Sequence, residues 1–364
     1  MKNKWIACLI IMFSAACSVP SGQITANPPD TITPTDVSAS TPASTIAISP
    51  SPIPISTPTP ANIKVPKSAA SNFQIQAKSA IENANRLVWL AGSQTLAAVT
   101  LNSLTLLNGH DLSIIKQYKV PDNTSLLDFD PISQYMALTE DRMSLKIMDW
   151  DGKTLQTFHP SGGFGSATFA PGGQTIWLSS MEEFKAVSYD VKTGKKSGEC
   201  GGFETAAPVY AAFPSPSGKW LVWTARATIQ LNHLPDCTFA AHIGHEDFIM
   251  SHTFSSDETI LATSTGGTLN GEFQPLIFLY DAATGEKRSI IPLKDSPAMG
   301  LAFSPDGTLL ASAGSGLFLW DASTGKQVAE LAPTDQRFTS VAFSVDGTLL
   351  AASSETEVAV FKVK

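Results

Sequence analysis

The chain has 364 residues, of which 43% are hydrophobic and 15% are charged, so it can bury a large core and differs from a disordered protein. Its formal net charge of −8 repels phosphate backbones, and no basic stripe offsets this repulsion. We therefore expect a globular protein that does not bind nucleic acid.

The first sixteen residues have the pattern of an export signal. Lys2 and Lys4 precede an uninterrupted apolar run from Trp5 to Phe13, and three small residues follow at 14–16. The alternative is a transmembrane anchor, but this run is far shorter than the ~20 residues needed to cross a bilayer. Residues 1–16 are therefore predicted to be a cleavable signal peptide.

Cys17 directly follows the expected cleavage site. The segment resembles the lipobox of bacterial lipoproteins, with Ser14 at the position where that family usually has Leu. The resemblance implies that Cys17 carries a diacylglycerol, and that the protein is extracytoplasmic and lipid-anchored to the cell membrane or the cell surface. Secretion without a lipid is the alternative.

Residues 17–70 differ in composition from the rest of the chain. Of the 24 prolines, 11 lie between Ser18 and Ala70, together with many Ser and Thr and few charges. Such a segment cannot bury a core, and it favours extended polyproline conformations. We interpret 17–70 as a disordered stalk that precedes a folded domain at 71–364.

One phrase recurs at a regular spacing within this domain. Residues 303–311 read FSPDGTLLA and residues 343–351 read FSVDGTLLA, 40 positions apart. Weaker copies of the phrase occur earlier, and a period of 40 to 49 residues is typical of a four-stranded propeller blade. The repeat units start at Trp89, Phe129, Phe169, Phe213, Phe254, Phe303 and Phe343.

Each unit shows the same succession of strands and turns. An apolar strand ends at the aromatic residue, a Ser-Pro-Asp-Gly turn or a variant of it follows, and a β-rich run such as Leu309–Ala311 returns. A third strand leads to a second turn with Thr-Gly at a fixed offset, as in Asp281–Glu286 and Asp321–Lys326. This succession predicts an all-β fold of repeated antiparallel sheets.

These features resemble the WD-repeat β-propeller family. The resemblance is carried by the FSPDGTLLA phrase, Trp320-Asp321 and Gly244-His245, and it covers about Phe73 to Lys364. It implies a seven-bladed β-propeller of four-stranded antiparallel blades. Only the sixth unit has the full Trp-Asp pair, so the hydrogen-bonded His-Ser-Asp-Trp network of the family should be mostly absent. We expect apolar packing to hold the blades together instead.

The seventh unit lacks an outer strand, because Lys364 directly follows its third strand, Val358–Val363. Phe73–Ala77 alternates like a strand and precedes the first unit. We expect this N-terminal strand to complete the last blade and close the ring, which would remove exposed sheet edges. A ring with one three-stranded blade is the alternative.

The densest group of residues suited to catalysis or metal binding is a histidine-rich stretch. The His242-x-x-His245 spacing suits a transition metal, but no second pair accompanies it, and His245 belongs to the Gly-His pair of the repeat. No nucleophile elbow, phosphate loop or His-Glu-x-x-His motif occurs elsewhere. We therefore expect no metal site, no cofactor and no catalytic residue. The stretch contains His233, His242, His245, Glu246, Asp247 and His252.

Cys200 and Cys237 lie near the outer strands of consecutive units. An exported protein meets an oxidising environment, so one interpretation is a disulfide between them. The other is two separate buried cysteines.

In propellers of this kind, ligands usually meet one face, formed by the loops between strands two and three and by the connections between blades. One such loop is lengthened by an insertion, Gly266–Pro275, and insertions on one face of a repeat array often mark its binding surface. Aromatic residues and Arg are enriched at binding sites. The candidate contact residues are Arg142, Phe184, Arg226, Asn270, Glu272, Phe273 and Arg337.

We therefore expect a non-catalytic propeller, anchored in the cell envelope, that binds or scaffolds a protein or an envelope polymer. The alternative is a small-molecule enzyme that uses the central funnel with a metal or a quinone, as propeller lactonases and quinoproteins do. Bound metal or quinone in the purified protein would distinguish the two.

Overall fold

The computed structural model describes residues 73–90, 94–180, 182, 184–201, 211–225 and 227–363. All regular elements in these ranges are β-strands, and none of the described residues form a helix long and apolar enough to cross a membrane. The predicted signal peptide 1–16, the stalk 17–70, Cys17 and Arg226 lie outside the described residues.

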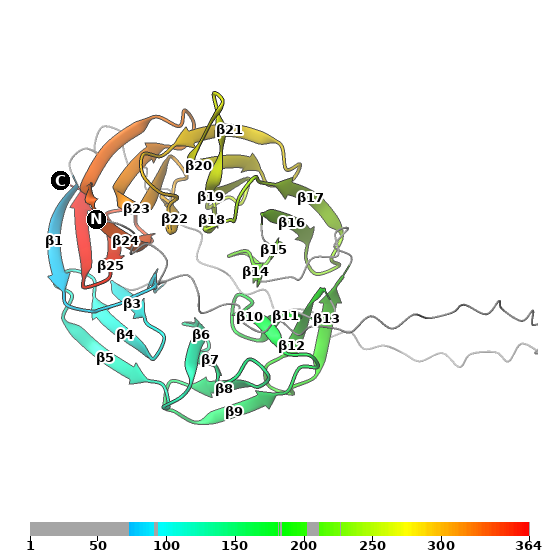
Figure 1. The fold of residues 1–364 in the computed structure, drawn as a ribbon. Helices are drawn as coiled ribbons and strands as arrows, with labels where there is room; N and C mark the ends of the chain where they lie inside the picture. Colours follow the sequence, from blue (N-terminus) through cyan, green and yellow to red (C-terminus); the bar gives the residue numbers. More distant parts are fainter. Residues whose placement is uncertain are drawn as a thin grey trace, which may run out of the picture. The chain divides into compact units, whose positions relative to one another are not determined.

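Five four-stranded antiparallel sheets, here called blades 1 to 5, follow one another along the chain. In each blade the strands pair in chain order, from the centre of the ring outward (Figure 1). Blades 1 and 2 contain β2 (Arg86–Trp89), β3 (Thr95–Val99), β4 (Ser103–Asn108), β5 (Ile114–Lys119), β6 (Ser125–Asp130), β7 (Tyr135–Thr139), β8 (Leu145–Asp149) and β9 (Thr154–Phe158). Blade 3 contains β10 (Phe164–Phe169), β11 (Thr175–Ser180), β12 (Lys185–Asp190) and β13 (Lys196–Cys200). Blades 4 and 5 contain β14 (Ala211–Pro214), β15 (Trp220–Ala225), β16 (Thr228–His233), β17 (Phe239–Gly244), β18 (Ser251–Phe254), β19 (Ile260–Leu269), β20 (Glu272–Asp281) and β21 (Lys287–Pro292).

The remaining strands form one six-stranded sheet, in the order β1-β26-β25-β24-β23-β22. The long strand β24 is shared within it, because β24 pairs with β23 along its first part and with β25 from Phe338 onward. The strands are β22 (Gly300–Phe303), β23 (Leu309–Asp321), β24 (Gln327–Phe343), β25 (Leu349–Ser354), β26 (Val358–Val363) and β1 (Phe73–Ser79).

The prediction of seven four-stranded blades, the last of them completed by an N-terminal strand, is wrong. The five blades are four-stranded, but the units that start at Phe303 and Phe343 share β24 in a single sheet. β1 pairs with β26 at the edge of that six-stranded sheet, so it does not complete a four-stranded last blade. The reason is the segment between these two units: Gln327–Phe343 stays extended where the other units have a separating connection.

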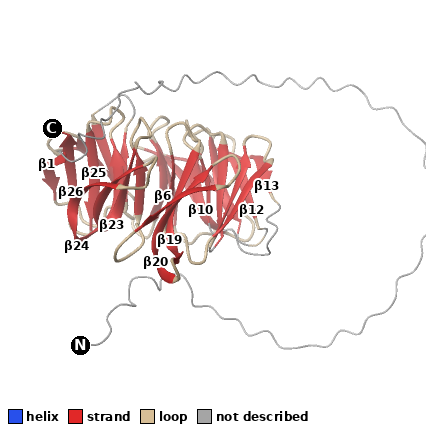
Figure 2. Ribbon diagram, turned by 90° about the horizontal axis from the view of Figure 1, so that it is seen from above, coloured by secondary structure: helices blue, strands red, loops and turns tan. Residues whose placement is uncertain are grey.

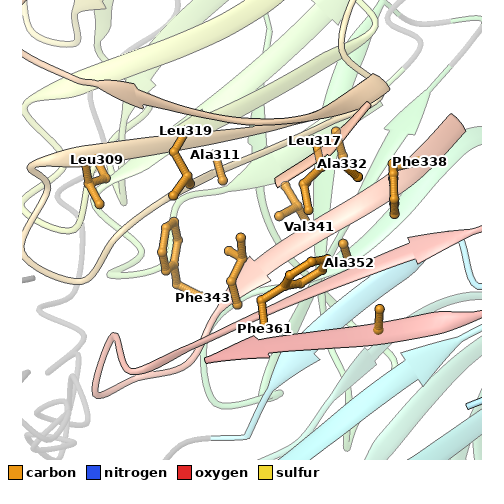
Figure 3. Close-up of a cluster of buried hydrophobic side chains, with 13 residues drawn as sticks. Leu309, Ala311, Leu317, Leu319, Ala332, Phe338, Val341, Phe343, Ala352 and Phe361 are labelled. Carbon is orange, nitrogen blue, oxygen red and sulfur yellow. The ribbon is translucent and has the colours of Figure 1, made fainter. Parts of the chain in front are cut away.

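Apolar side chains hold the sheets face to face. Figure 3 shows Leu319 of β23 opposite Phe343 and Phe361, so the two parts of the six-stranded sheet pack against each other. Similar clusters lie between successive blades, and another joins blade 1 to β25 and β26. The ring is therefore continuous, and the predicted apolar packing between its sheets is confirmed.

A buried carboxylate adds a polar connection between three blades. Asp128 of β6 is 3% exposed, pairs with the guanidinium of Arg86 from β2, and accepts a hydrogen bond from the backbone N–H of Phe169 in β10 at 2.8 Å. An ion pair at a buried position stays favourable only when its remaining oxygens are also hydrogen-bonded. Asp128 meets this condition and links the inner strands of blades 1, 2 and 3.

The repeated FSPDGT phrase forms the predicted turn. The Ser304 hydroxyl donates to Asp306 at 2.6 Å, and the carboxylate of Asp306 accepts from the backbone N–H of Thr308 at 3.1 Å. Gly307 has φ of 69°, a conformation that glycine adopts without steric cost. The turn at 344–348 repeats the same contacts. The phrase is therefore a self-contained polar turn between the first two strands of a unit.

Candidate binding face

Antiparallel pairing places two kinds of connection at the same end of each blade. One is the loop from the second strand to the third, and the other leads from the fourth strand to the next blade. Hydrogen bonds join these connections: the N–H of Phe164 donates to the carbonyl of Arg142 at 3.1 Å, and that of Met299 to Ala313 at 2.7 Å. We call this end the connector face. Its described segments are 80–85, 100–102, 120–124, 140–144, 159–163, 182, 184, 227, 245–250, 266–275, 293–299, 333–337 and 355–357.

The opposite end, which carries the remaining turns of each unit, is called the turn face. Exposed large hydrophobic side chains are distributed unevenly between the two ends. Among the described residues, those on the turn face are Ile132 and Val345, at 63% and 44% exposed, and five others lie on the outer strands of the sheets: Ile75, Ile114, Ile115, Leu155 and Phe239. On the connector face they are Leu101, Met143, Phe184, Phe248, Phe273 and Met299. Since exposed apolar side chains that share one surface mark interaction sites, the connector face is the candidate site.

The insertion Gly266–Pro275 was expected to form a loop. It instead extends β19 and β20 into a longer hairpin. Thr268 pairs with Phe273 and Leu269 with Glu272. Asn270 and Gly271 have φ of 55° and 85°, as a two-residue type I′ turn requires. An Asn-Gly pair between β-forming residues was the sequence signal for this hairpin.

The hairpin tip presents Asn270, Glu272 and Phe273 together, and all three side chains are exposed. Phe273 is 62% exposed although its ring lies over Gly266. Figure 2 shows β19 and β20 projecting beyond the ends of the other strands. These three predicted contact residues therefore share one rigid element.

Arg142 and Phe184 lie on loops of neighbouring blades 2 and 3. The Arg142 guanidinium donates to the carbonyl of Gly165 at 2.9 Å, so part of its hydrogen-bonding capacity joins the two blades. Gly162 and Gly163 lie between these loops, with Glu182 against the first and Met143 against the second. Any side chain at either glycine would displace these neighbours. The two glycines therefore let the loops of both blades converge.

Arg337 lies on a third element, the middle of β24, where it is exposed and pairs with Ser315 of β23. It borders a depression of about 370 Å³. The depression is lined by 335–338 and 354–357. The predicted contact residues thus fall on separate parts of the connector face, and Arg226 is outside the described residues.

The residues of the histidine-rich stretch lie in separate structural positions. His245 lies within hydrogen-bonding distance of the hydroxyls of Thr263 and Tyr280, at 3.3 and 3.5 Å. These contacts of the Gly-His histidine belong to the His-Ser-Asp-Trp type of network that was expected to be mostly absent. Burial, and then the nearby charge of Lys287, lowers the pKa of His245 to about 4. No three His, Cys, Asp or Glu side chains of the described residues lie close enough together to hold a metal ion.

His252 likewise has a packing role. Its ring packs against that of Phe213, with the centroids 5.0 Å apart, and burial lowers its pKa to about 4. A histidine that stays neutral at physiological pH and packs against an aromatic ring belongs to the core between blades 4 and 5.

Cys200 and Cys237 form a disulfide with their Cα atoms 5.4 Å apart. Cys200 ends β13 and is buried, and Cys237 lies in the turn between β16 and β17. The bond therefore links blade 3 to blade 4 beside the buried rings of Trp177 and Trp223.

A cavity of about 290 Å³ separates β21 and its following connection from β23. Phe318 and Trp320 line it, and the Trp320 indole donates to the hydroxyl of Ser312 at 2.8 Å. The Gly-Ser-Gly run at 314–316 also lines it, and a Cβ atom at Gly316 would lie 2.7 Å from the ring of Phe318. Its volume is at the lower limit for a small-molecule site.

Sequence reasoning missed Leu101, Phe248 and Met299 as exposed residues of the connector face. It also placed Glu246 and Asp247 with the histidines, whereas Glu246 contacts the hairpin: the Thr268 hydroxyl donates to its carboxylate at 2.7 Å. The available signal was position, because each of these residues lies between two predicted strands at the connector end of its unit.

The family model described as WD domain, G-beta repeat matches residues 289–321. This segment runs from β21 through the following connection and β22 to the end of β23. It includes Trp320-Asp321 and the FSPDGT turn. No curated protein matches the chain.

Proposed function

Because this chain is a WD-repeat β-propeller protein, we propose that it is a non-catalytic binding module that holds a protein partner against its connector face. The observation that carries the proposal is the concentration of exposed hydrophobic side chains at that end, with Phe273 on a projecting hairpin. Aromatic residues on rigid elements bind at a low entropic cost, because few rotamers are lost.

Site-specific photo-cross-linking in intact cells tests this proposal. A photoreactive amino acid at Met143 or Phe273 should cross-link the full-length chain to a protein partner. The matched controls are Ile132 and Val345, which are exposed on the turn face. Cross-linking of equal yield from both ends, or from neither, would contradict the proposal.

The proposal includes no cofactor and no catalytic residue. Metal analysis and an absorption spectrum of the purified full-length protein test this part. One equivalent of a bound metal ion or a quinone band would favour the small-molecule enzyme instead.

We also propose that the chain is exported and held at the cell envelope by a lipid on Cys17. The lipobox-like segment at 14–17 supports this placement, and so does the Cys200–Cys237 disulfide, since structural disulfides are typical of oxidising compartments. The Cys17→Ser variant should be found in the soluble fraction, whereas the unchanged protein stays with the membrane. Membrane retention of the variant would show that the anchor is something other than a lipid on Cys17.

A further inference from the structure

The hairpin of β19 and β20 extends beyond the pairing of blade 5. β18 pairs with β19 only as far as Ser264, and β21 pairs with β20 only as far as Leu276. Beyond these residues the two strands pair within the sheet only with each other. The connection 245–250 lies against this projecting part, because the Thr265 hydroxyl donates to the carbonyl of Asp247 at 3.0 Å.

An aromatic ring and a carboxylate meet on one side of the hairpin, and a second, exposed Phe follows in the adjoining connection. A Cβ atom at Gly266 would lie 2.6 Å from the ring of Phe273 and 2.8 Å from the carboxylate of Asp247. The Phe273 ring and the Asp247 carboxylate thus meet above Gly266, where any residue with a Cβ atom would push them away. Phe248, next to Asp247 in the chain, is 56% exposed. We call residues 246–248 and 268–273 the hairpin ledge.

Three carboxylates belong to the ledge, two of them on the same face of the hairpin as Phe273 and the third, Glu272, on the opposite face, because neighbouring side chains of a strand alternate. Glu246 is oriented by the Thr268 hydroxyl at 2.7 Å, and Asp247 by the backbone N–H of Phe248 at 2.8 Å, while Glu272 is exposed at the turn. None of the ion pairs found among the described residues involves any of the three. The ledge therefore carries negative charge beside exposed aromatic faces, with no cation of the described chain paired to it.

The charge of the whole connector face has the same sign. Its described cations are Arg142, Lys294 and Arg337, and its acidic residues outnumber them: Glu82, Asp122, Glu140, Asp141, Glu182, Glu246, Asp247, Glu272, Asp295, Asp335, Glu355 and Glu357. Two of these acids, Glu140 and Glu357, pair with Lys146 and Lys78 of adjoining strands, and the remaining ten still outnumber the cations. A positively charged partner is attracted to such a surface before contact, and an acidic one is repelled.

We propose that the hairpin ledge receives an arginine- or lysine-bearing segment of the partner protein; this inference rests on the proposed protein-binding function. A guanidinium or ammonium group stacks on the face of Phe273 or Phe248 and pairs with the carboxylates beside it. The rings also bury the methylene stems of such side chains. Aromatic faces and carboxylates side by side suit a long cationic side chain, which has both an apolar stem and a charged end.

Fluorescence anisotropy with the full-length protein in detergent tests this proposal. The probe is a labelled ten-residue peptide of alternating Arg and Ser, and its counterpart has Glu in place of Arg. The ledge variant Glu246→Gln/Asp247→Asn/Glu272→Gln removes three carboxylates at the ledge. The control variant Asp122→Asn/Asp335→Asn/Glu355→Gln removes three exposed carboxylates elsewhere on the connector face, so both variants lose the same net charge.

We expect the ledge variant to bind the Arg peptide about tenfold more weakly and the control variant less than about twofold more weakly. Phe273→Ala should weaken binding about fivefold, and Phe273→Tyr should restore it, since Tyr keeps the aromatic face. Equal weakening by both triple variants would overturn the proposal, because it would assign binding to the overall field. Equal binding of the Glu peptide, or no binding of the Arg peptide, would also overturn it.

Failure here is distinguishable from failure of the proposed function. If the photoreactive residue at Phe273 cross-links a protein in cells while the Arg peptide does not bind the ledge, the binding function stands and the cationic partner is wrong. If the cross-links come from a lipid or a polymer rather than a protein, the protein-binding function itself is wrong.

Discussion

Acidic residues have different roles on the turn face and on the hairpin ledge. On the turn face, Asp111, Asp236 and Asp257 accept hydrogen bonds from Ser or Thr residues within two positions of themselves. On the hairpin ledge, Glu246 and Glu272 belong to no such turn. A carboxylate enclosed by its own turn fixes the backbone, whereas a solvated one remains available to another molecule.

The acids of the turn face that accept hydrogen bonds within their own turns have lowered pKa values. The side chain and then the backbone of Ser113 hold the pKa of Asp111 below its usual value. At Asp346, burial raises the pKa, but hydrogen bonds from Ser344 and Thr348 outweigh it and the net direction is downward. These acids therefore stabilise the folded chain in their ionised form.

The largest expected effect concerns Glu258, a buried acid of the turn face. Its carboxylate accepts from the hydroxyl of Ser215 at 2.9 Å, and from the N–H and hydroxyl of Ser217 at 2.7 Å, so it joins blade 5 to blade 4. Glu258→Ala should lower the free energy of unfolding by about 3 kcal/mol, since it leaves the buried Ser215 hydroxyl without its acceptor and removes both bonds to Ser217. Urea denaturation measures this change.

The control for this prediction is Glu272→Ala on the hairpin ledge. Because Glu272 is exposed, its removal should change the free energy of unfolding by less than about 0.5 kcal/mol. A similar loss of unfolding free energy in both variants would show that the buried acid of the turn face and the exposed acid of the ledge do not differ in their contribution to stability.

The second prediction concerns the pH dependence of stability and two histidines near the connector end of blade 5. Burial lowers the folded pKa of His245 and of His252 from the ordinary histidine value of 6.5 to about 4, so between these pH values the unfolded chain binds more protons. Stability should therefore be complete above pH 6.5 and fall as the pH drops toward 4. In His252→Phe the pH-dependent loss in this range should shrink by about 2 kcal/mol, as measured by urea midpoints at successive pH values. An unchanged pH slope would mean that His252 does not contribute.

Much of the fold could be predicted from the sequence, because turns depend on local chemistry. Asp306 and Gly307 specify their turn through contacts within five residues, so the repeat phrase was sufficient to locate it. The continuity of β24 was not predictable in this way. Pro333 and Asp335 disfavour a strand locally, and pairing with β23 and β25 overrides that preference.

The candidate site was predictable only in part. The insertion drew attention to Phe273, but exposure depends on packing that residue type does not reveal. Phe164 is 1% exposed and Phe248 is 56% exposed, although both follow polar connector segments. The difference is that Phe164 packs into the apolar cluster between blades 2 and 3. This contact depends on how the blades pack against each other, which the local sequence does not specify.

A smaller effect is expected at Asp346, the acid of the turn face that repeats the role of Asp306. Its carboxylate accepts from the hydroxyls of Ser344 and Thr348 at 2.6 and 2.8 Å. Asp346→Ala should cost about 1 kcal/mol, as measured by urea denaturation. Because the folded pKa is lowered, the stabilisation is present above the unfolded pKa and disappears as the pH falls through the folded one. Asp335→Ala on the connector face is the control. It should change neither the free energy of unfolding nor the pH dependence of that free energy.

The smallest effect on stability is expected from shortening the hairpin that distinguishes the connector face. Deleting 266–269 and 272–275 leaves Asn270-Gly271 between Thr265 and Leu276, a pair that already faces each other across the two strands. The residues removed are paired within the sheet only with one another, and shortening a connection changes its closure entropy by only ~0.6 kcal/mol per halving. The free energy of unfolding should therefore stay within about 1 kcal/mol of that of the unchanged protein, whereas cross-linking of a partner through Met143 should fall. Unchanged cross-linking in a stable shortened protein would assign binding to the loops of blades 2 and 3, around Arg142 and Phe184, and would leave the hairpin without a role in it.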